Sequence, residues 1–187
     1  IPAMADDGSA EGACYAACLN DGNTLNDLAW LKQKHMPYFG TAYSSIQVHE
    51  VLKKNPNVNY TDLQDTWPEK AAELVSEGKI GAIFYGKMEW GPRALGNRSI
   101  IADCRNPEIT KKINGSIKNR PLFQPFCPSI LEEDRERLFE RSYPNKHMTC
   151  AFRMKTEFRD KIPASVHIDG TGRAQFVEET DNPMYYR

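Results

Sequence analysis

Residues 80–102 read Ile-Gly-Ala-Ile-Phe-Tyr-Gly-Lys-Met-Glu-Trp-Gly-Pro-Arg-Ala-Leu-Gly-Asn-Arg-Ser-Ile-Ile-Ala, and this stretch indicates the fold. Its two ends, 80–85 and 99–102, are short apolar runs with β-branched residues, which are typical of buried strands. The glycines and the proline between them set an irregular backbone path. A glycine-rich loop between two strands is a common place for a ligand site in an α/β fold.

Helices are predicted on either side of this stretch. Upstream, Pro68 suits the first turn of a helix over 66–77, and Gly78 is a typical helix terminator. Downstream, Asn106 and Pro107 have the character of a helix start. The helix that follows would bury a stripe of isoleucines spaced four residues apart: Ile109, Ile113 and Ile117. Helix, strand, loop, strand and helix in this order predict an α/β fold.

Weaker patterns predict the remaining elements. Residues 8–19 are rich in small side chains and favour a closely packed helix. Ser44 and Gln47 have the spacing of a capping box, before a helix that ends near Lys54. A charged surface helix is predicted over 132–140. Strands are predicted from short apolar runs at 126–131, 149–154 and 165–168, with 175–177 extending the last.

The loop between the two apolar runs carries polar side chains suited to an anion. Three cations and two hydrogen-bonding side chains project from it: Lys87, Arg93, Arg98, Asn97 and Ser99. Guanidinium groups bind phosphate oxygens in pairs, and glycine lets backbone N–H groups approach an anion. The loop is not a Walker motif, because it lacks Gly-Lys-Ser/Thr. An anion site is favoured, while a structural loop in which Glu89 pairs with either arginine stays open.

Charge is unevenly distributed along the 187-residue chain, whose net charge is −1. Residues 1–80 have a net charge of −5, whereas residues 87–120 hold eight lysines and arginines against three acidic residues. This local surplus suits an anionic ligand, although on charge alone a solvated basic face is the simpler interpretation. The chain is 40% hydrophobic, which is enough for a packed core, and no apolar run reaches the length of a membrane span.

Five cysteines are scattered along the chain. An odd number of separated cysteines is typical of reduced thiols, so a cytoplasmic protein is expected. Cys14 and Cys18 lie one helical turn apart, but no second pair at zinc-binding spacing accompanies them. They are therefore predicted to be small buried side chains, and no metal site is predicted. The first residues lack a signal-peptide pattern and an initiator Met, which suggests a cut inside a longer protein.

The motif Glu-Trp-Gly-Pro-Arg-Ala-Leu-Gly-Asn-Arg-Ser at 89–99 resembles the signature of the O-carbamoyltransferase family that includes the nodulation and tobramycin carbamoyltransferases. Only Trp90 differs, where the family has Phe. Other segments resemble family motifs in the same order, at 113–120, 123–129 and 167–175. Residues 1–17 resemble the end of the family's preceding domain, so the resemblance covers nearly the whole chain.

The resemblance implies a two-domain enzyme of which this chain is the carboxy-terminal part. Residues 1–20 would be the tail of a Kae1-like transferase domain, 21–65 a connection, and 66–187 a YrdC-like domain with a twisted mixed sheet and flanking helices. That domain would use carbamoyl phosphate and ATP with Mg²⁺ to form carbamoyl adenylate for transfer to a hydroxyl acceptor. The metal of the preceding domain would not be held by this chain. Neither nucleic acid nor a membrane is expected as a partner.

The resemblance and the chemistry together assign the site residues. Joining two polyanions requires fixed cations that offset their repulsion, which gives a catalytic role to Lys87, Arg93 and Arg98. Substrate binding is assigned to further polar positions of the motifs: Asn97, Ser99, Asn114, Lys118, Arg120, Thr171 and Arg173. As a charged loop residue, Arg98 is expected to make few core contacts, and Lys111 and Lys112 are expected to be solvated.

Two features leave a second hypothesis open, a non-catalytic module that binds a nucleotide or carbamoyl phosphate. Gln124 stands where the family often has Arg, and the bulk of the implied transferase domain is not in this chain. An RNA-binding domain is a third, and the net charge and the lack of an aromatic basic stripe count against it. His167 and Asp169 would share one side of a strand, where a satisfied pair is commoner than a base or a metal ligand. No nucleophile motif accompanies them, so a catalytic triad is rejected.

Overall fold

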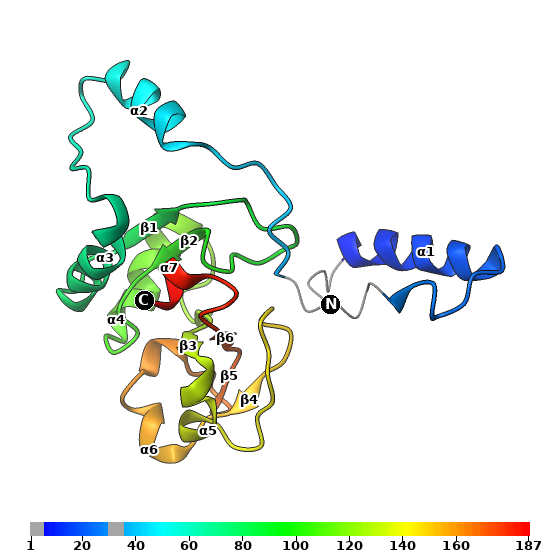
Figure 1. Cartoon of the computed structure of the whole chain (residues 1–187). Coiled ribbons are helices and arrows are strands. Elements are labelled where there is room, and N and C mark those ends of the chain that lie inside the picture. Colours follow the sequence, from blue (N-terminus) through cyan, green and yellow to red (C-terminus); the bar gives the residue numbers. More distant parts are fainter. Residues whose placement is uncertain (1–5, 30–35) are drawn as a thin grey trace.

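The structure, a computed structural model, describes residues 6–29 and 36–187 (Figure 1). Its body is a mixed α/β fold of short two-stranded sheets surrounded by helices, which confirms the predicted α/β class. The helices are α1 (Asp6–Asn20), α2 (Ser45–Lys53), α3 (Trp67–Ser76), α4 (Glu108–Ile113), α5 (Arg135–Leu138), α6 (Thr156–Arg159) and α7 (Pro183–Tyr186). The strands are β1 (Gly81–Phe84), β2 (Arg98–Ile101), β3 (Ser129–Leu131), β4 (Phe152–Arg153), β5 (Thr171–Gly172) and β6 (Gln175–Val177). Single turns are η2 (Gln64–Thr66), η3 (Asn114–Lys118), η4 (Glu132–Asp134) and η5 (Pro163–Ser165).

The stretch at 80–102 forms an antiparallel pair of strands with a loop between them. β1 pairs with β2 from Gly81 opposite Ile101 to Phe84 opposite Arg98, as the two apolar runs predict. Gly78 follows α3 with a φ of 80°, a backbone conformation that glycine adopts without strain. Because the loop leaves β1 and returns along its neighbour β2, its two ends are held about 5 Å apart.

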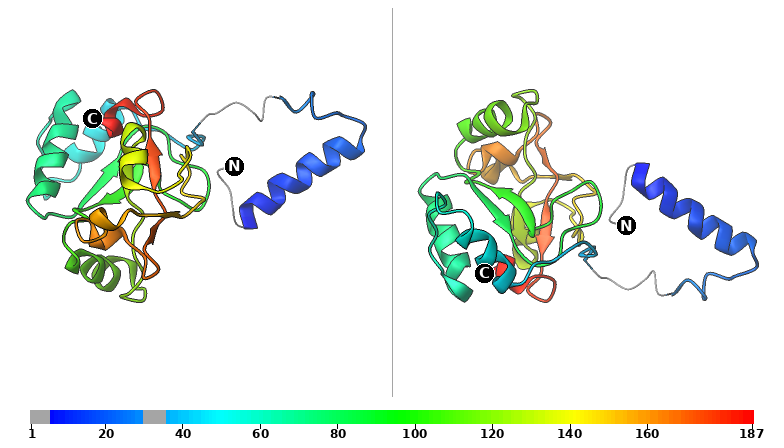
Figure 2. Two further views of the ribbon diagram at one scale, coloured as in Figure 1. Left: turned by 90° about the horizontal axis from the view of Figure 1, so that it is seen from below. Right: turned by 90° about the horizontal axis from the view of Figure 1, so that it is seen from above.

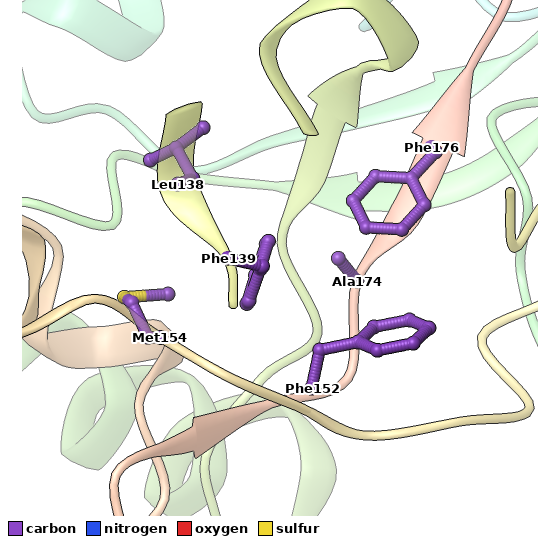
Figure 3. Packing of buried hydrophobic residues seen from close by; sticks show 6 residues of the cluster. All are labelled: Leu138, Phe139, Phe152, Met154, Ala174 and Phe176. Carbon is purple, nitrogen blue, oxygen red and sulfur yellow. The ribbon is translucent and has the colours of Figure 1, made fainter. Parts of the chain in front are cut away.

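A second group of strands carries an aromatic core. β3 pairs with β6 in parallel, and β4 pairs with β5 antiparallel. Phe139 packs edge-on against Phe152 and Phe176, with ring centroids 6.2 and 5.8 Å away. Figure 3 shows the six residues of this buried cluster: Leu138, Phe139, Phe152, Met154, Ala174 and Phe176. Arg173 lies between β5 and β6, so the aromatic core beneath these strands fixes its backbone.

Two smaller buried clusters hold the elements that surround the loop. Leu95 of the loop is 2% exposed and packs with Met36 and Met148. Ile109 and Ile113 of α4 pack with Ala164. The first cluster anchors the loop itself, and the second anchors the helix that follows β2.

One predicted stripe is interrupted by a change of helix type. Ile109 and Ile113 are buried as predicted, but Ile117 is 46% exposed, so that part of the prediction is wrong. α4 continues into a π turn, η3, whose extra residue rotates the following side chains relative to an α-helix. Asn114, at the start of this turn, is fully buried.

Several predicted elements are shorter than expected. The strand predicted at 126–131 is reduced to β3, the strand at 149–154 to β4, and the helix at 132–140 to η4 and α5. No strand forms over 165–168, because the chain turns at 168–170. Oδ1 of Asp169 accepts hydrogen bonds from the backbone N and Oγ1 of Thr171, at 2.9 and 2.7 Å, and Gly170 has a φ of 77°. A turn closed by an aspartate side chain replaces the expected alternation.

The amino-terminal helices lie outside the packed body. In Figures 1 and 2, α1 stands apart from the other elements. Cys14 and Cys18 are exposed, so the prediction that they are buried is wrong, because no described segment packs against this helix. α2 begins with the predicted capping box: Oγ of Ser44 accepts from the backbone N of Gln47, and the Gln47 side chain accepts from the backbone N of Ser44. None of the residues of α2 is buried.

Candidate functional site

The loop between β1 and β2 is organised by the carboxylate of Glu89. Its Oε1 atom accepts backbone hydrogen bonds from Leu95, Asn97 and Arg98, at 2.8, 2.8 and 3.1 Å. No ion pair joins Glu89 to Arg93 or Arg98 in the described part of the chain. A carboxylate that accepts several backbone N–H groups holds the surrounding backbone firmly. The alternative of a loop held by a Glu89–arginine ion pair is therefore wrong, although Glu89 does have a structural role.

Arg98 binds the backbone of the loop. Its guanidinium donates to the carbonyl oxygens of Tyr85 at 2.6 Å and of Gly86 and Thr41 at 3.2 Å each. The same group lies over the ring of Phe84, 3.8 Å from its centroid. Arg98 thus contacts exposed loop groups, not the buried core, and it does so because bending the chain at 85–86 leaves carbonyl groups that need a donor.

Asn97 and Ser99 are also engaged within the loop. The Asn97 amide donates to the carbonyl of Lys87 at 2.8 Å and accepts from the amide of Asn182 at 2.8 Å. Oγ of Ser99 accepts from the backbone N of Gly96 at 2.9 Å. Both side chains are buried, at 4% and 8% exposure. Asn97 connects the loop to the segment before α7, while Ser99 also lines the pocket described below.

Asn114 and Arg120 close the segment after α4. The buried amide of Asn114 donates to the carbonyls of Pro121 and Gln124, at 3.2 and 2.8 Å, and its oxygen accepts from Nε of Arg120 at 2.6 Å. The Arg120 guanidinium also lies over the ring of Phe126, 4.3 Å from its centroid. Asn114 therefore shapes the segment. Arg120 uses Nε for its bond to Asn114, and its two terminal nitrogens do not take part in that bond.

Two arginines lie beside each other near the loop. Nε of Arg93 is buried and has no hydrogen-bond partner among the described residues. Burial, and then the neighbouring guanidinium of Arg173, lower the pKa of Arg93, and the Cys127 thiol partly opposes this. Arg173 donates from Nε to Sγ of Cys127 at 3.2 Å. No carboxylate in the described ranges pairs with either arginine. Like charges held together without a counter-ion indicate a place for an anion.

A pocket of about 330 Å³ opens beside Arg93. Its cations come from separate segments: Arg93 from the loop, Lys118 from η3 and Arg120 from just beyond it. Ser99 and Ser129 supply hydroxyl groups. The apolar part of the wall consists mainly of Ile101, Ile109, Ile113 and Phe126. No Asp or Glu belongs to this described lining, and Lys118 has no ion pair within it.

The structure brings only some of the predicted residues together. Arg93, Ser99, Lys118 and Arg120 line the pocket, and Arg173 reaches its edge through Cys127. The others lie elsewhere. Lys87 is exposed on the loop, and Thr171 bonds to Asp169 in the turn before β5. Arg98, Asn97 and Asn114 bond to backbone or amide groups as described above.

Cys127, Ser129 and Tyr185 are among the lining residues that were not predicted from the sequence. Cys127 and Ser129 belong to the segment at 123–129 that resembles a family motif, and this was the available signal. Tyr185 of α7 gave no signal at all. Its hydroxyl lies 2.6 Å from Oγ of Ser129, and its ring packs so closely on Gly96 that a Cβ there would lie 2.6 Å from a ring carbon.

Neither a membrane span nor a metal cluster is found in the described part of the chain. Over residues 6–29 and 36–187, no helix is both long enough and apolar enough to cross a bilayer. In the same ranges, His, Cys, Asp and Glu side chains do not gather in groups of three or more that could hold a metal ion.

Fold and site together define an α/β domain with a pocket lined by cations. Comparison with known proteins gives the family. A family model described as "Carbamoyltransferase C-terminus" matches residues 72–187, so the chain belongs to that family and the resemblance is confirmed.

Several relatives match almost the whole chain. An uncharacterized protein of Methanocaldococcus jannaschii is 56% identical over 100% of this chain and 31% of its own length. Nodulation protein NolO of Bradyrhizobium diazoefficiens is 34% identical over 99% of this chain and 34% of its own length. Nodulation protein U of Azorhizobium caulinodans is 31% identical over 94% of this chain and 28% of its own length. The chain thus spans about a third of the length of these relatives.

Proposed function

We propose that this chain is the carboxy-terminal part of an O-carbamoyltransferase, whose pocket beside Arg93 binds carbamoyl phosphate and ATP and forms carbamoyl adenylate for a hydroxyl acceptor. In this proposal residues 66–187 are a YrdC-like domain, joined through 21–65 to the tail of a transferase domain at 1–20. Family membership and the nodulation relatives support the carbamoyl chemistry. The cationic lining of the pocket supports anionic substrates.

The observation that carries the proposal is the state of Arg93. A buried guanidinium atom without a partner costs free energy, and a second arginine beside it adds repulsion. Both costs are removed when a phosphate group accepts hydrogen bonds from Arg93 and Arg173 together. Such a site is destabilised when empty and stabilised by its ligand, which is a common property of binding sites.

The size and lining of the pocket suggest how the substrates lie. A volume of about 330 Å³ is at the small end for ligand pockets, so it suits carbamoyl phosphate and the phosphates of ATP, with the adenosine extending beyond. Lys118 and Arg120 follow the loop in the sequence and also line the pocket. Their positive charges offset the negative charge of the second polyanion. Carbamoyl adenylate keeps only the α-phosphorus of ATP. Pyrophosphate therefore leaves from ATP, orthophosphate leaves from carbamoyl phosphate, and a water molecule is consumed.

The other predicted residues take different parts in this proposal. Arg98, Asn97 and Asn114 position the pocket by holding backbone groups. Lys87 and Thr171 are proposed to contact ATP, whose Mg²⁺ arrives with the nucleotide. The partner is the transferase domain outside this chain, which holds its own metal. The five free cysteines support a reducing, cytoplasmic location.

The test is the release of pyrophosphate from Mg-ATP, with and without carbamoyl phosphate, by this chain and by a full-length protein that contains it. Release that depends on carbamoyl phosphate is expected, and Arg93→Gln should abolish it. Calorimetry should show carbamoyl phosphate bound at least about tenfold more weakly by Arg93→Gln, because a hydrogen bond to a charged group contributes about 1.5 to 3 kcal/mol. Lys112→Ala is the control, since Lys112 is exposed on α4 and lies outside the pocket.

Two results would replace this function with an alternative. Carbamoyl phosphate binding by a full-length protein that releases no pyrophosphate would identify a non-catalytic binding module. Binding of RNA that falls steeply with salt and needs no carbamoyl phosphate would identify a nucleic-acid module.

A further inference from the structure

Cys127 is placed unlike the other cysteines of the chain. Its Sγ accepts a hydrogen bond from Nε of Arg173 at 3.2 Å, and it interacts electrostatically with Arg93. It also lines the pocket that carries Lys118 and Arg120. Cys104 lines the same pocket, but burial raises the pKa of its thiol. Cys14 and Cys18 are exposed on α1, far from these cations.

The surroundings of Cys127 favour chemistry at its sulfur. Cysteine reacts through its sulfur, and the guanidinium of Arg173 lies within hydrogen-bond distance of Sγ of Cys127. A pocket lined by cations and free of carboxylates also raises the local concentration of anionic reagents. The half-buried sulfur of Cys127 is therefore reachable from a cavity that attracts anions.

We propose that Cys127 is a modification site, at which oxidation by a peroxide and occupation of the pocket by an anion exclude each other. The inference rests on the anion site of the proposed function but not on the formation of carbamoyl adenylate. The sulfur attacks one oxygen of hydrogen peroxide, and an S–O bond forms as the O–O bond breaks. The leaving hydroxide takes up the thiol proton as water, so the sulfur is oxidised to a sulfenic acid and the peroxide is reduced.

Exclusion follows from the shared donors. The N–H group that binds Sγ belongs to the Arg173 guanidinium, which interacts electrostatically with Arg93, and in the proposed function both arginines bind the phosphate. The oxygen added to Cys127 would accept hydrogen bonds from these same groups and occupy the edge of the pocket. A phosphate already bound there would in turn keep the peroxide from the sulfur.

The first experiment compares iodoacetate, which is an anion, with the neutral iodoacetamide. The rate of alkylation of each cysteine is measured by peptide mass spectrometry on the unmodified chain. Because Cys14 and Cys18 are exposed, they serve as references within the same molecule. The ratio of the iodoacetate rate to the iodoacetamide rate should be about tenfold higher for Cys127 than for these references. Inorganic phosphate, but not chloride at equal ionic strength, should slow the reaction of Cys127 alone.

Variants extend the test to the arginine and to oxidation. Arg173→Gln should lower the rate ratio of Cys127 towards that of the references. Treatment with hydrogen peroxide should abolish phosphate binding by the native sequence, while Cys127→Ala should still bind phosphate afterwards. Equal ratios at Cys127 and the references, absence of protection by phosphate, or oxidised protein that still binds phosphate would each overturn the inference. None of these readings uses ATP, so a failure of pyrophosphate release is a separate result.

Discussion

Replacing Glu89 by Gln tests whether one carboxylate holds the loop above the pocket. Oε1 of Glu89 accepts backbone hydrogen bonds from Leu95, Asn97 and Arg98, and the first two residues are buried. Glutamine keeps an acceptor oxygen of the same shape but removes the negative charge. The substitution therefore changes the strength of three hydrogen bonds while leaving the packing of the side chain nearly unaltered.

The expected loss follows from the difference between charged and neutral hydrogen bonds. Hydrogen bonds to a charged group contribute about 1.5 to 3 kcal/mol each, and neutral ones about 0.5 to 1.5 kcal/mol. A loss of about 1 kcal/mol at each of the three bonds lowers the free energy of unfolding by about 3 kcal/mol. Since a domain of this size is stable by about 5 to 15 kcal/mol, Glu89→Gln should still fold.

Urea unfolding followed by circular dichroism measures this loss. Glu108→Gln is the control, because its ion pair with Lys111 is exposed and should contribute no more than about 0.5 kcal/mol. A loss in Glu89→Gln no larger than that of the control would refute the reasoning. In a double-mutant cycle with Arg93→Gln, the coupling energy should stay within about 0.5 kcal/mol. A larger coupling energy would indicate an ion pair between Glu89 and Arg93, in disagreement with the structure.

Three further variants test separate features. Gly96→Ala should lower the free energy of unfolding, measured in urea, by about 1 to 3 kcal/mol more than Gly78→Ala does. Both glycines have positive φ, but only at Gly96 would a Cβ collide with the ring of Tyr185. Arg98→Lys should lower the free energy of unfolding by about 1 to 2 kcal/mol, because an ammonium group does not match the several carbonyls that the guanidinium reaches. An unchanged free energy of unfolding would indicate that Arg98 serves only to bind a ligand. Burial lowers the pKa of His147 to about 4, from about 6.5 in the unfolded chain. The unfolded state therefore binds the proton more readily, and the free energy of unfolding should fall as pH decreases from 6.5 towards 4. Since solvent screens this partly buried ring, His147→Gln should recover about 1 to 2 kcal/mol at pH 4 in acid-unfolding curves, and an unchanged curve would contradict it.

The sequence predicted local structure well where the signals were local. The apolar runs at 80–85 and 99–102, the Gly78 terminator and the Ser44 capping box all depend on neighbouring residues, and all are confirmed. Ile117 fails because nothing in the spacing of isoleucines reveals a π turn.

The site was predicted less completely, for a physical reason. Loop composition showed that cations gather at 87–98, but it could not show which of them a bent backbone would use as donors. Arg98 bonds to carbonyls that become available only once the loop has folded, while Nε of Arg93 has no partner in the part of the chain that the structure describes. Tyr185 reaches the pocket from a helix far along the chain, and only the tertiary structure brings it there.

The bonds that fix the loop run from side chains to backbone atoms, which every amino acid possesses except for the N–H group that proline lacks. Glu89 and Arg98 grip the main chain at Thr41, Tyr85 and Leu95 without regard to the side chains carried there. In a library of all single substitutions, positions 41 and 85 should accept many residues, whereas most changes at 89 and 98 should lower stability. Destabilising substitutions would thus be concentrated at the few residues whose side chains bond to the backbone, and the residues that supply only backbone atoms would vary more freely.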